Sequence, residues 1–348
     1  MSPEKPSIIE PYDSGLLDVG AGNRVYWEQV GSPAGIPVLR VHGGPGSGFT
    51  VRARRAFDPE RFRAILFDQR NCGRSLPHAS DPAVDLTANT TAHLIADMEQ
   101  LREQLDVEQW FLHGGSWAST LMLAYAEAHP ERVLGLIIHA VTMTRRSETA
   151  WLYEGVGRVF PEAQERFREY IPAEERGEDV FDLLAAYGRR MRHPDPEVRA
   201  RTAAEWLAWE DAVISGEVNG SPGAYSNRPD EAKLAFVRIC AHYFSQGGFL
   251  EDGQILRDAG KLAGIPGALL HGRFDLGGPL ITPFELAKAW PDAELIVGED
   301  AGHTGSAALR ALEEAAYERV FRLGAARLAP GGYPRASIRA SWVPEYPK

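Results

Sequence analysis

The first 140 residues of the chain alternate between short apolar runs and segments of helical periodicity. The runs that we predict as strands span 24–30, 37–41, 64–67, 110–112 and 133–140. Helical patterns cover 90–105 and 119–129 between the later runs. Because strands that alternate with helices usually pair in parallel, this pattern predicts an α/β fold with a mostly parallel central sheet flanked by helices.

The alternation stops near residue 142 and resumes near residue 263. Helical patterns with almost no strand signal fill the interval, most clearly at 162–170, 180–191 and 196–214. Strand patterns return at 265–270 and 293–297, each followed by a helical pattern, 283–290 and 309–323. We therefore predict a core formed by 1–141 and 263–325, an inserted all-helical cap over 142–262, and a C-terminal tail over 326–348.

The cap is rich in aromatic residues, which we expect to pack in its interior: Trp151, Tyr153, Trp206, Trp209 and Tyr243. The tail contains several prolines and no periodicity, so we expect it to wrap the surface or to be mobile.

Composition narrows the classes of function. The chain has 348 residues, of which 44% are hydrophobic, enough for a sizeable core. A formal net charge of −11 argues against nucleic acid and anionic membranes as partners. The two cysteines, Cys72 and Cys240, are too few for a disulfide scaffold. Without an apolar run of about 20 residues or an apolar signal segment, we expect a cytoplasmic protein, and its oligomeric state stays open.

Ser116 lies in the stretch that carries the strongest chemical signal. The apolar run 110–112 leads into Gly114-Gly115-Ser116-Trp117-Ala118, and the helical pattern starts at once. A strand, a tight turn around a serine and a helix form a nucleophile elbow, in which small residues must stand two positions either side of the serine. Gly114 meets this need, and Ala118 is small although it replaces the usual glycine. An ordinary glycine turn is the alternative interpretation.

A glycine-rich loop, His42-Gly43-Gly44-Pro45-Gly46-Ser47-Gly48, follows the predicted strand 37–41. Such a loop can aim a free N–H at an oxyanion, and we expect Gly43 or Gly44 to supply one donor and Trp117 the other. A phosphate cradle is less well supported, because no Lys-Ser/Thr pair follows. A purely structural turn is the remaining alternative.

Three residues follow predicted strands in the order serine, acid, histidine. They are Ser116, Asp275 and His303, and this is the chain order of α/β-hydrolases. The loops after parallel strands gather at one edge of the sheet, so we expect the three side chains to meet. Ser116 would attack a carbonyl, His303 would transfer the proton, and Asp275 would orient the imidazole. A turn aspartate and a surface histidine are the alternatives for the last two.

Taken together, these motifs resemble the proline iminopeptidases of the α/β-hydrolase superfamily. The matching segments are H-G-G-P-G at 42–46, D-Q-R-N-C-G-R-S at 68–75, G-G-S-W-A-S-T-L at 114–121, G-R-F-D at 272–275 and A-G-H at 301–303. The likeness continues through the cap in R-R-S-E-T-A-W at 145–151, W-L-A-W-E at 206–210 and H-Y-F at 242–244. It covers roughly residues 5 to 325.

The resemblance implies release of an N-terminal proline from short peptides without a metal or organic cofactor. It also implies that cap carboxylates bind the imino group, which would assign Glu210 to this role, with Arg145 or Arg146 as the cap arginine. The family pattern has a second glutamate where this chain has Cys240. An amidase or esterase acting on a small metabolite is therefore the alternative function on the same fold. A catalytically silent binding protein is a third hypothesis.

Overall fold

The computed structural model describes residues 9–217 and 219–327, and these residues form an eight-stranded sheet. The strand order is β1-β2-β4-β3-β5-β6-β7-β8; β1 and β4 run antiparallel to β2, and all other neighbours are parallel. The strands are β1 (Asp13–Asp18), β2 (Arg24–Gly31), β3 (Ile36–Arg40), β4 (Phe62–Phe67), β5 (Trp110–Ser116), β6 (Val133–Val141), β7 (Gly267–Gly272) and β8 (Ala293–Gly298). The predicted mostly parallel α/β architecture is confirmed.

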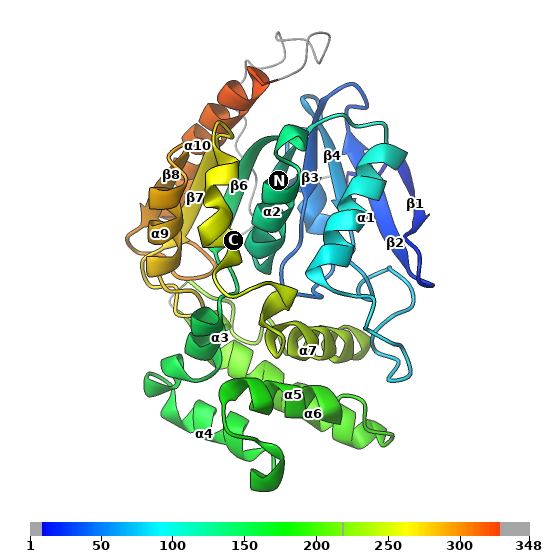
Figure 1. Cartoon of the computed structure of the whole chain (residues 1–348), viewed down its shortest axis with the longest axis vertical. Helices are drawn as coiled ribbons and strands as arrows, with labels where there is room; N and C mark the ends of the chain where they lie inside the picture. The colour runs from blue at the N-terminus through cyan, green and yellow to red at the C-terminus, as the bar shows by residue number, and fades with distance from the viewer. Residues whose placement is uncertain (1–8, 218, 328–348) are drawn as a thin grey trace, which may run out of the picture.

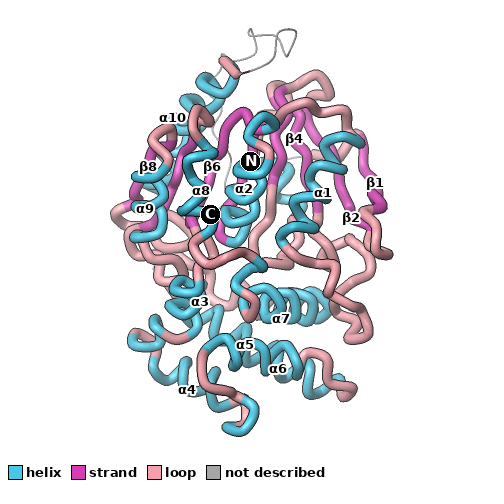
Figure 2. Tube along the Cα trace, in the orientation of Figure 1, coloured by secondary structure: helices cyan, strands magenta, loops and turns pink. Residues whose placement is uncertain are grey.

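Helices cover both faces of this sheet (Figures 1 and 2). Three helices, α1 (Thr91–Gln104), α2 (Trp117–Ala128) and α9 (Ile281–Ala289), contribute to a hydrophobic cluster on one face. The long helix α10 (Ala307–Ala325) contributes to a second cluster with β3, β4, β6 and β7. Strands β5 and β6 are buried along most of their length, which explains their continuous apolar sequence.

The helices between β6 and β7 are α3 (Arg146–Tyr153), α4 (Pro161–Glu169), α5 (Val180–Arg190), α6 (Pro196–Glu210), α7 (Asp230–Phe244) and α8 (Gln254–Asp258). Figure 1 shows α3 to α7 gathered beyond one end of the strands, with α3 directly after β6. They share a hydrophobic cluster of their own that includes Tyr153, Trp206 and Trp209, all buried. Tyr153, Trp206 and Trp209 thus pack in the interior of the insertion, as the sequence predicts, and Trp151 is partly buried against the same cluster. Tyr243 differs, because it belongs to the hydrophobic cluster of the sheet and its ring contacts Trp117.

One predicted helix differs from the observed one. The periodicity over 196–214 predicts a single helix, but α6 is α-helical only to Glu210 and continues as a π-helical turn over Asp211–Ser215. Single π-helical turns inside helices occur frequently at functional sites. The change of helix type falls directly after the glutamate that the family resemblance points to.

Two absences concern only the part of the chain that the structure describes. In that part, no helix is long and apolar enough to cross a membrane. The same residues contain no group of three or more His, Cys, Asp or Glu side chains that could hold a metal ion. The predicted tail over 326–348 falls almost entirely on residues 328–348, which lie outside the described residues.

Candidate active site

Ser116 lies at the junction of β5 and α2 in a strained backbone conformation. Its φ of 58° and ψ of −133° lie in a region that non-glycine residues rarely adopt. Gly114 makes the turn possible, because a Cβ there would lie 2.7 Å from Val41 O and 2.8 Å from Ala118 Cβ. Ala118 therefore fills the space that the usual second glycine would leave open. The geometry is that of a nucleophile elbow, with Ser116 presented at the end of the sheet.

The glycine-rich loop after β3 runs directly beside Ser116. A Cβ on Gly43 would lie 3.0 Å from Gly115 O and 3.4 Å from Ser116 Cβ, so the backbone of Gly43 contacts the elbow. His42 anchors the loop, since its Nδ1 donates to Gly43 O at 2.9 Å and its Nε2 accepts from Gln69 N at 3.0 Å. The loop and the first residues of α2 thus flank Ser116, where their N–H groups could stabilise an oxyanion.

Asp275 and His303 come together although they are far apart in the sequence. Asp275 follows β7, His303 follows β8, and Nδ1 of His303 lies 3.0 and 3.1 Å from the two carboxylate oxygens of Asp275. Gly278 N also donates to Asp275 Oδ1 at 2.8 Å. Ser116 and His303 line the same cavity, although no hydrogen bond joins them. Such bonds often form only when substrate is bound.

The electrostatic environment of the site favours the charged forms of His303 and Asp275. Burial disfavours the imidazolium of His303, but Asp275, Glu217 and Glu210 outweigh this effect and raise the pKa of His303 to about 9. Burial also disfavours the carboxylate of Asp275, yet His303 holds the pKa of Asp275 below its usual value. The pair therefore stabilises positive charge on His303, as a proton-accepting imidazole requires.

Glu210 lies in the small cavity beside Ser116 and His303, whose volume is about 50 Å³. Its carboxylate is buried, and Oε1 accepts hydrogen bonds from Tyr153 Oη at 2.8 Å and Trp206 Nε1 at 3.1 Å. Burial raises the pKa of Glu210, although these hydrogen bonds lower it. Among the described residues Oε2 has no hydrogen-bond partner. A buried carboxylate with a free oxygen is suited to bind a cation in this cavity.

Three other predicted residues do not line this cavity. Arg145 forms ion pairs with Glu148 and Glu285, and Glu148 in turn lines the cavity. The guanidinium of Arg146 lies 3.6 Å from the centre of the Phe181 ring, near the surface. Cys240 is fully buried and donates from Sγ to Pro45 O at 3.3 Å, beneath the glycine-rich loop. Burial, and then the charge of Glu210, raises the pKa of the Cys240 thiol.

Glu217 is a site residue that the sequence analysis missed. Its Oε2 accepts from His303 N at 2.6 Å, and its Oε1 accepts from Thr304 N at 2.6 Å and from Thr304 Oγ1 at 2.7 Å. A Cβ on Gly302 would lie 1.7 Å from Glu217 Oε2, so only glycine leaves room for this carboxylate. Glu217 follows the π-helical turn, and the sequence pattern indicates only a glutamate in a loop. The one available signal is the glycine before His303.

Comparisons with known proteins identify the fold and the family of the chain. A family model described as alpha/beta hydrolase fold matches residues 36–306. A protein of Streptomyces coelicolor named probable proline iminopeptidase is 46% identical over 312 residues, which are 87% of this chain and 94% of that protein. The proline iminopeptidase of Arabidopsis thaliana is 42% identical over 300 residues, covering 86% of this chain and 77% of the relative.

Solved structures show the same fold at lower sequence identity. The crystal structure of a proline iminopeptidase from Mycobacterium smegmatis superposes with a TM-score of 0.54 at 18% identity, over 90% of this chain and 99% of that one. The sequence relatives are close enough, over enough of their length, to establish the family. This chain is a member of the proline iminopeptidase family and has the α/β-hydrolase fold.

Proposed function

We propose that the protein is a serine aminopeptidase that releases N-terminal proline from short peptides. The observation that carries the proposal is the position of Glu210, buried in the same cavity as Ser116 and His303 with one carboxylate oxygen free among the described residues. The names of the relatives support the same activity.

In the proposed reaction, Ser116 Oγ attacks the carbonyl carbon of the N-terminal residue while His303 Nε2 accepts the hydroxyl proton. Asp275 keeps the remaining imidazole proton on Nδ1 and stabilises the positive charge. His303 then donates its proton to the peptide nitrogen, the C–N bond breaks, and the shortened peptide leaves as an amine. Water attacks the acyl-enzyme by the same route and releases proline.

The oxyanion of the tetrahedral intermediate would accept hydrogen bonds from two backbone N–H groups. Trp117, the first residue of α2, would supply one, and Gly43 or Gly44 would supply the other. The loss of one such donor typically costs about 10²–10³ in rate. The contact of Gly43 with the turn around Ser116 supports a role for this loop as the second donor.

Recognition of the free amine would depend on Glu210. The imino nitrogen of an N-terminal proline is charged at neutral pH, and a charge taken out of water into a small cavity needs a paired carboxylate. Glu148 is a poor second candidate, since Thr142, Met143, Arg145 and Thr282 already donate to its carboxylate. Arg145 would then hold Glu148 in place, and we assign it no direct contact with substrate.

The test compares proline β-naphthylamide with β-naphthyl cyclopentanecarboxylate, an ester that lacks the amine. For each variant we divide kcat/KM for proline β-naphthylamide by kcat/KM for the ester. We expect Glu210→Gln to lower this ratio by about 10- to 100-fold, which corresponds to the loss of one hydrogen bond to a charged group. The exposed Glu162 on α4 offers a matched control, Glu162→Gln, which should keep the wild-type ratio. An unchanged ratio in Glu210→Gln would remove Glu210 from amine recognition.

One observation favours a second function, an amidase or esterase for a small metabolite. Cys240 replaces the second glutamate that the family resemblance implies, and it lies close enough to Glu210 to be influenced by its charge. If the wild type cleaves the ester readily and releases no proline, while Cys240→Glu gains proline release, this second function is correct. Failure of Ser116 to react with a fluorophosphonate would instead indicate a silent binding protein.

A further inference from the structure

A second, larger cavity adjoins the small one at His303. Its volume is about 370 Å³, and His303 and Ala140 line both cavities. The glycine-rich loop lies between them, since Gly44 lines the small cavity and Gly43 the larger one. Ser116 lines the small cavity, and its neighbour Gly115 lines the larger one.

The proposed reaction requires the acyl part of the substrate and its leaving group to occupy different cavities. Glu210 would hold the amine of the acyl part in the small cavity. His303 must reach the leaving nitrogen in order to protonate it, so the leaving group has to extend past His303. The larger cavity begins there, and about 370 Å³ lies within the usual range of ligand pockets.

A chain of hydrogen bonds fixes the polar wall of the larger cavity. Arg40 Nη1 can only donate, so His113 Nδ1 accepts and the proton of His113 lies on Nε2, 2.8 Å from Tyr317 Oη. We assign the Tyr317 hydroxyl as donor to His139 Nε2, at 2.7 Å. His139 then carries its proton on Nδ1, 3.5 Å from Glu313 Oε1.

The charges that face this cavity are positive in sum. Burial lowers the pKa of three of its imidazoles, to about 3 for His139, so these rings are neutral: His42, His113 and His139. Arg40 and Arg310 are cationic, and His303 is cationic below its pKa of about 9. Glu313 is the opposing carboxylate, and burial raises its pKa to about 7, although Arg310 and Arg40 lower it. The cavity is therefore suited to an anionic group.

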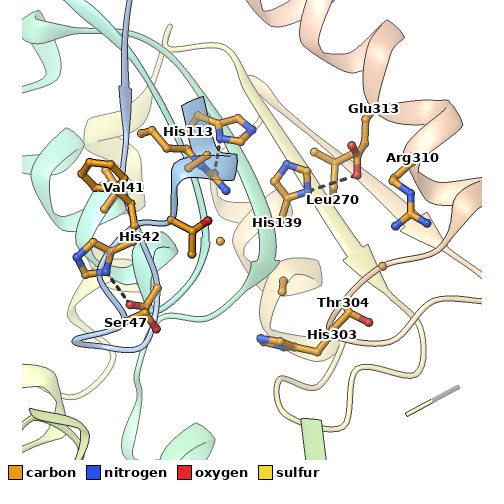
Figure 3. A pocket seen from close by; sticks show the side chains of 18 of the residues that line it. Val41, His42, Ser47, His113, His139, Leu270, His303, Thr304, Arg310 and Glu313 are labelled. Carbon is orange, nitrogen blue, oxygen red and sulfur yellow. Dashed lines mark hydrogen bonds and ion pairs between the residues drawn. The ribbon is translucent and has the colours of Figure 1, made fainter. Parts of the chain in front are cut away.

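Arg310 is the residue best placed to bind that group. Figure 3 shows Arg310 and Glu313 on one side of the cavity, opposite His42 and Ser47, with His303 and Thr304 below them. The Arg310 side chain is exposed and forms no hydrogen bond or ion pair with any residue in 9–217 or 219–327. A guanidinium fork matches the geometry of a carboxylate.

We propose that the larger cavity binds the leaving group of short peptides, with the C-terminal carboxylate of the peptide bound by Arg310. This inference rests on the proposed function and names its substrate class, which is free dipeptides and tripeptides with N-terminal proline. Long or C-terminally blocked peptides lack a carboxylate at that place and are poorer substrates.

The experiment measures kcat/KM for Pro-Ala and Pro-Ala-Ala against their C-terminal amides. In the wild type we expect at least one acid to exceed its amide by about tenfold, the effect of one charge-assisted hydrogen bond. In Arg310→Gln this ratio falls to about 1, while Glu313→Gln, which removes the opposing carboxylate, raises it. The control is Arg322→Gln, an exposed arginine on the same helix that does not line the cavity, and it keeps the wild-type ratio.

Two results would overturn the inference while the proposed function stands. One is proline release from acids and amides at equal rates by the wild type, and the other is a ratio that Arg310→Gln does not change. If the wild type releases proline neither from these peptides nor from proline β-naphthylamide, the proposed function itself fails. The assignment of the cavity then fails with it.

Discussion

Glu217 Oε2 accepts a hydrogen bond of 2.6 Å from the backbone N–H of His303. The bond joins a loop between β6 and β7 to the loop after β8, and the other oxygen of Glu217 binds Thr304 in the same way. The position of His303 therefore depends on two partners, Asp275 at its ring and Glu217 at its backbone. The charge of Glu217 also contributes to the raised pKa of His303.

Replacing Glu217 by glutamine keeps the size of the side chain and removes its charge. We expect kcat to fall by about tenfold, because the amide has one acceptor oxygen, so one of the two backbone N–H groups loses its acceptor and the other keeps a weaker hydrogen bond. His303 must be unprotonated to accept the proton of Ser116, so kcat/KM rises as pH increases through its pKa of about 9. Loss of the negative charge lowers that pKa, and the rising limb moves to lower pH.

The measurement for this variant is the pH profile of proline β-naphthylamide cleavage from pH 6 to 10. Glu299→Gln serves as a control, since Glu299 is exposed, lies near His303 in the sequence and pairs with Arg273 instead. A rising limb at the same pH in the wild type and Glu217→Gln would show that Glu217 does not influence His303.

Gly302→Ala tests the same contact from the other side. The new methyl group would lie 1.7 Å from Glu217 Oε2, so the carboxylate must leave the backbone of His303. We expect a loss of kcat of at least about tenfold in the wild-type background and a much smaller loss in a Glu217→Ala background. Equal losses in both backgrounds would mean that Gly302 is required for another reason.

Tyr317→Phe tests the buried polar chain between α10 and the sheet. The Tyr317 hydroxyl bridges Nε2 of His113 and Nε2 of His139, and its removal leaves both without this partner. We expect the free energy of unfolding to fall by about 1–3 kcal/mol, measured by urea denaturation. Tyr12→Phe, at a half-exposed position, should cost less than about 0.5 kcal/mol. Equal stability of the two variants would contradict the bridging role.

The buried carboxyl group of Glu127 lies outside the active site and should make the stability of the protein depend on pH. It is buried on α2, neither carboxylate oxygen has a hydrogen-bond partner among the described residues, and burial raises its pKa to about 8. The folded state holds this proton more tightly than the unfolded state, whose glutamate pKa is about 4.3. Stability therefore falls as pH rises between these two values.

Glu127→Gln removes that dependence. We expect the variant to be more stable than the wild type at pH 8.5, by up to about 5 kcal/mol, and similar to it at pH 4. Thermal unfolding at both pH values measures the difference. If the stability difference between Glu127→Gln and the wild type is the same at pH 8.5 and at pH 4, the carboxylate has a partner in solution.

The sequence identified those parts of the site that depend on local signals. The turn around Ser116 is encoded within a few residues, because Gly114 is the one residue that fits between Val41 and Ala118. Asp275 and His303 could be placed from strand ends alone, since the loops after parallel strands meet at one edge. The structure brings these two side chains into contact as that argument requires.

Residues whose roles depend on distant partners could not be predicted in the same way. The sequence does not reveal that Arg145 pairs with Glu285 and does not line the cavity, because Glu285 lies on α9, far along the chain. Glu217 gives no periodic signal in its loop. The π-helical turn after Glu210 also escapes a pattern based on 3.6 residues per turn.

The central claim is that Ser116 cleaves the bond after an N-terminal proline. Its most direct test is proline release from proline β-naphthylamide by the wild type and by Ser116→Ala, with folding of both checked by circular dichroism. We expect release by the wild type and a loss of at least about 10³-fold in kcat for the variant. Release at a similar rate by a folded Ser116→Ala protein would contradict the account.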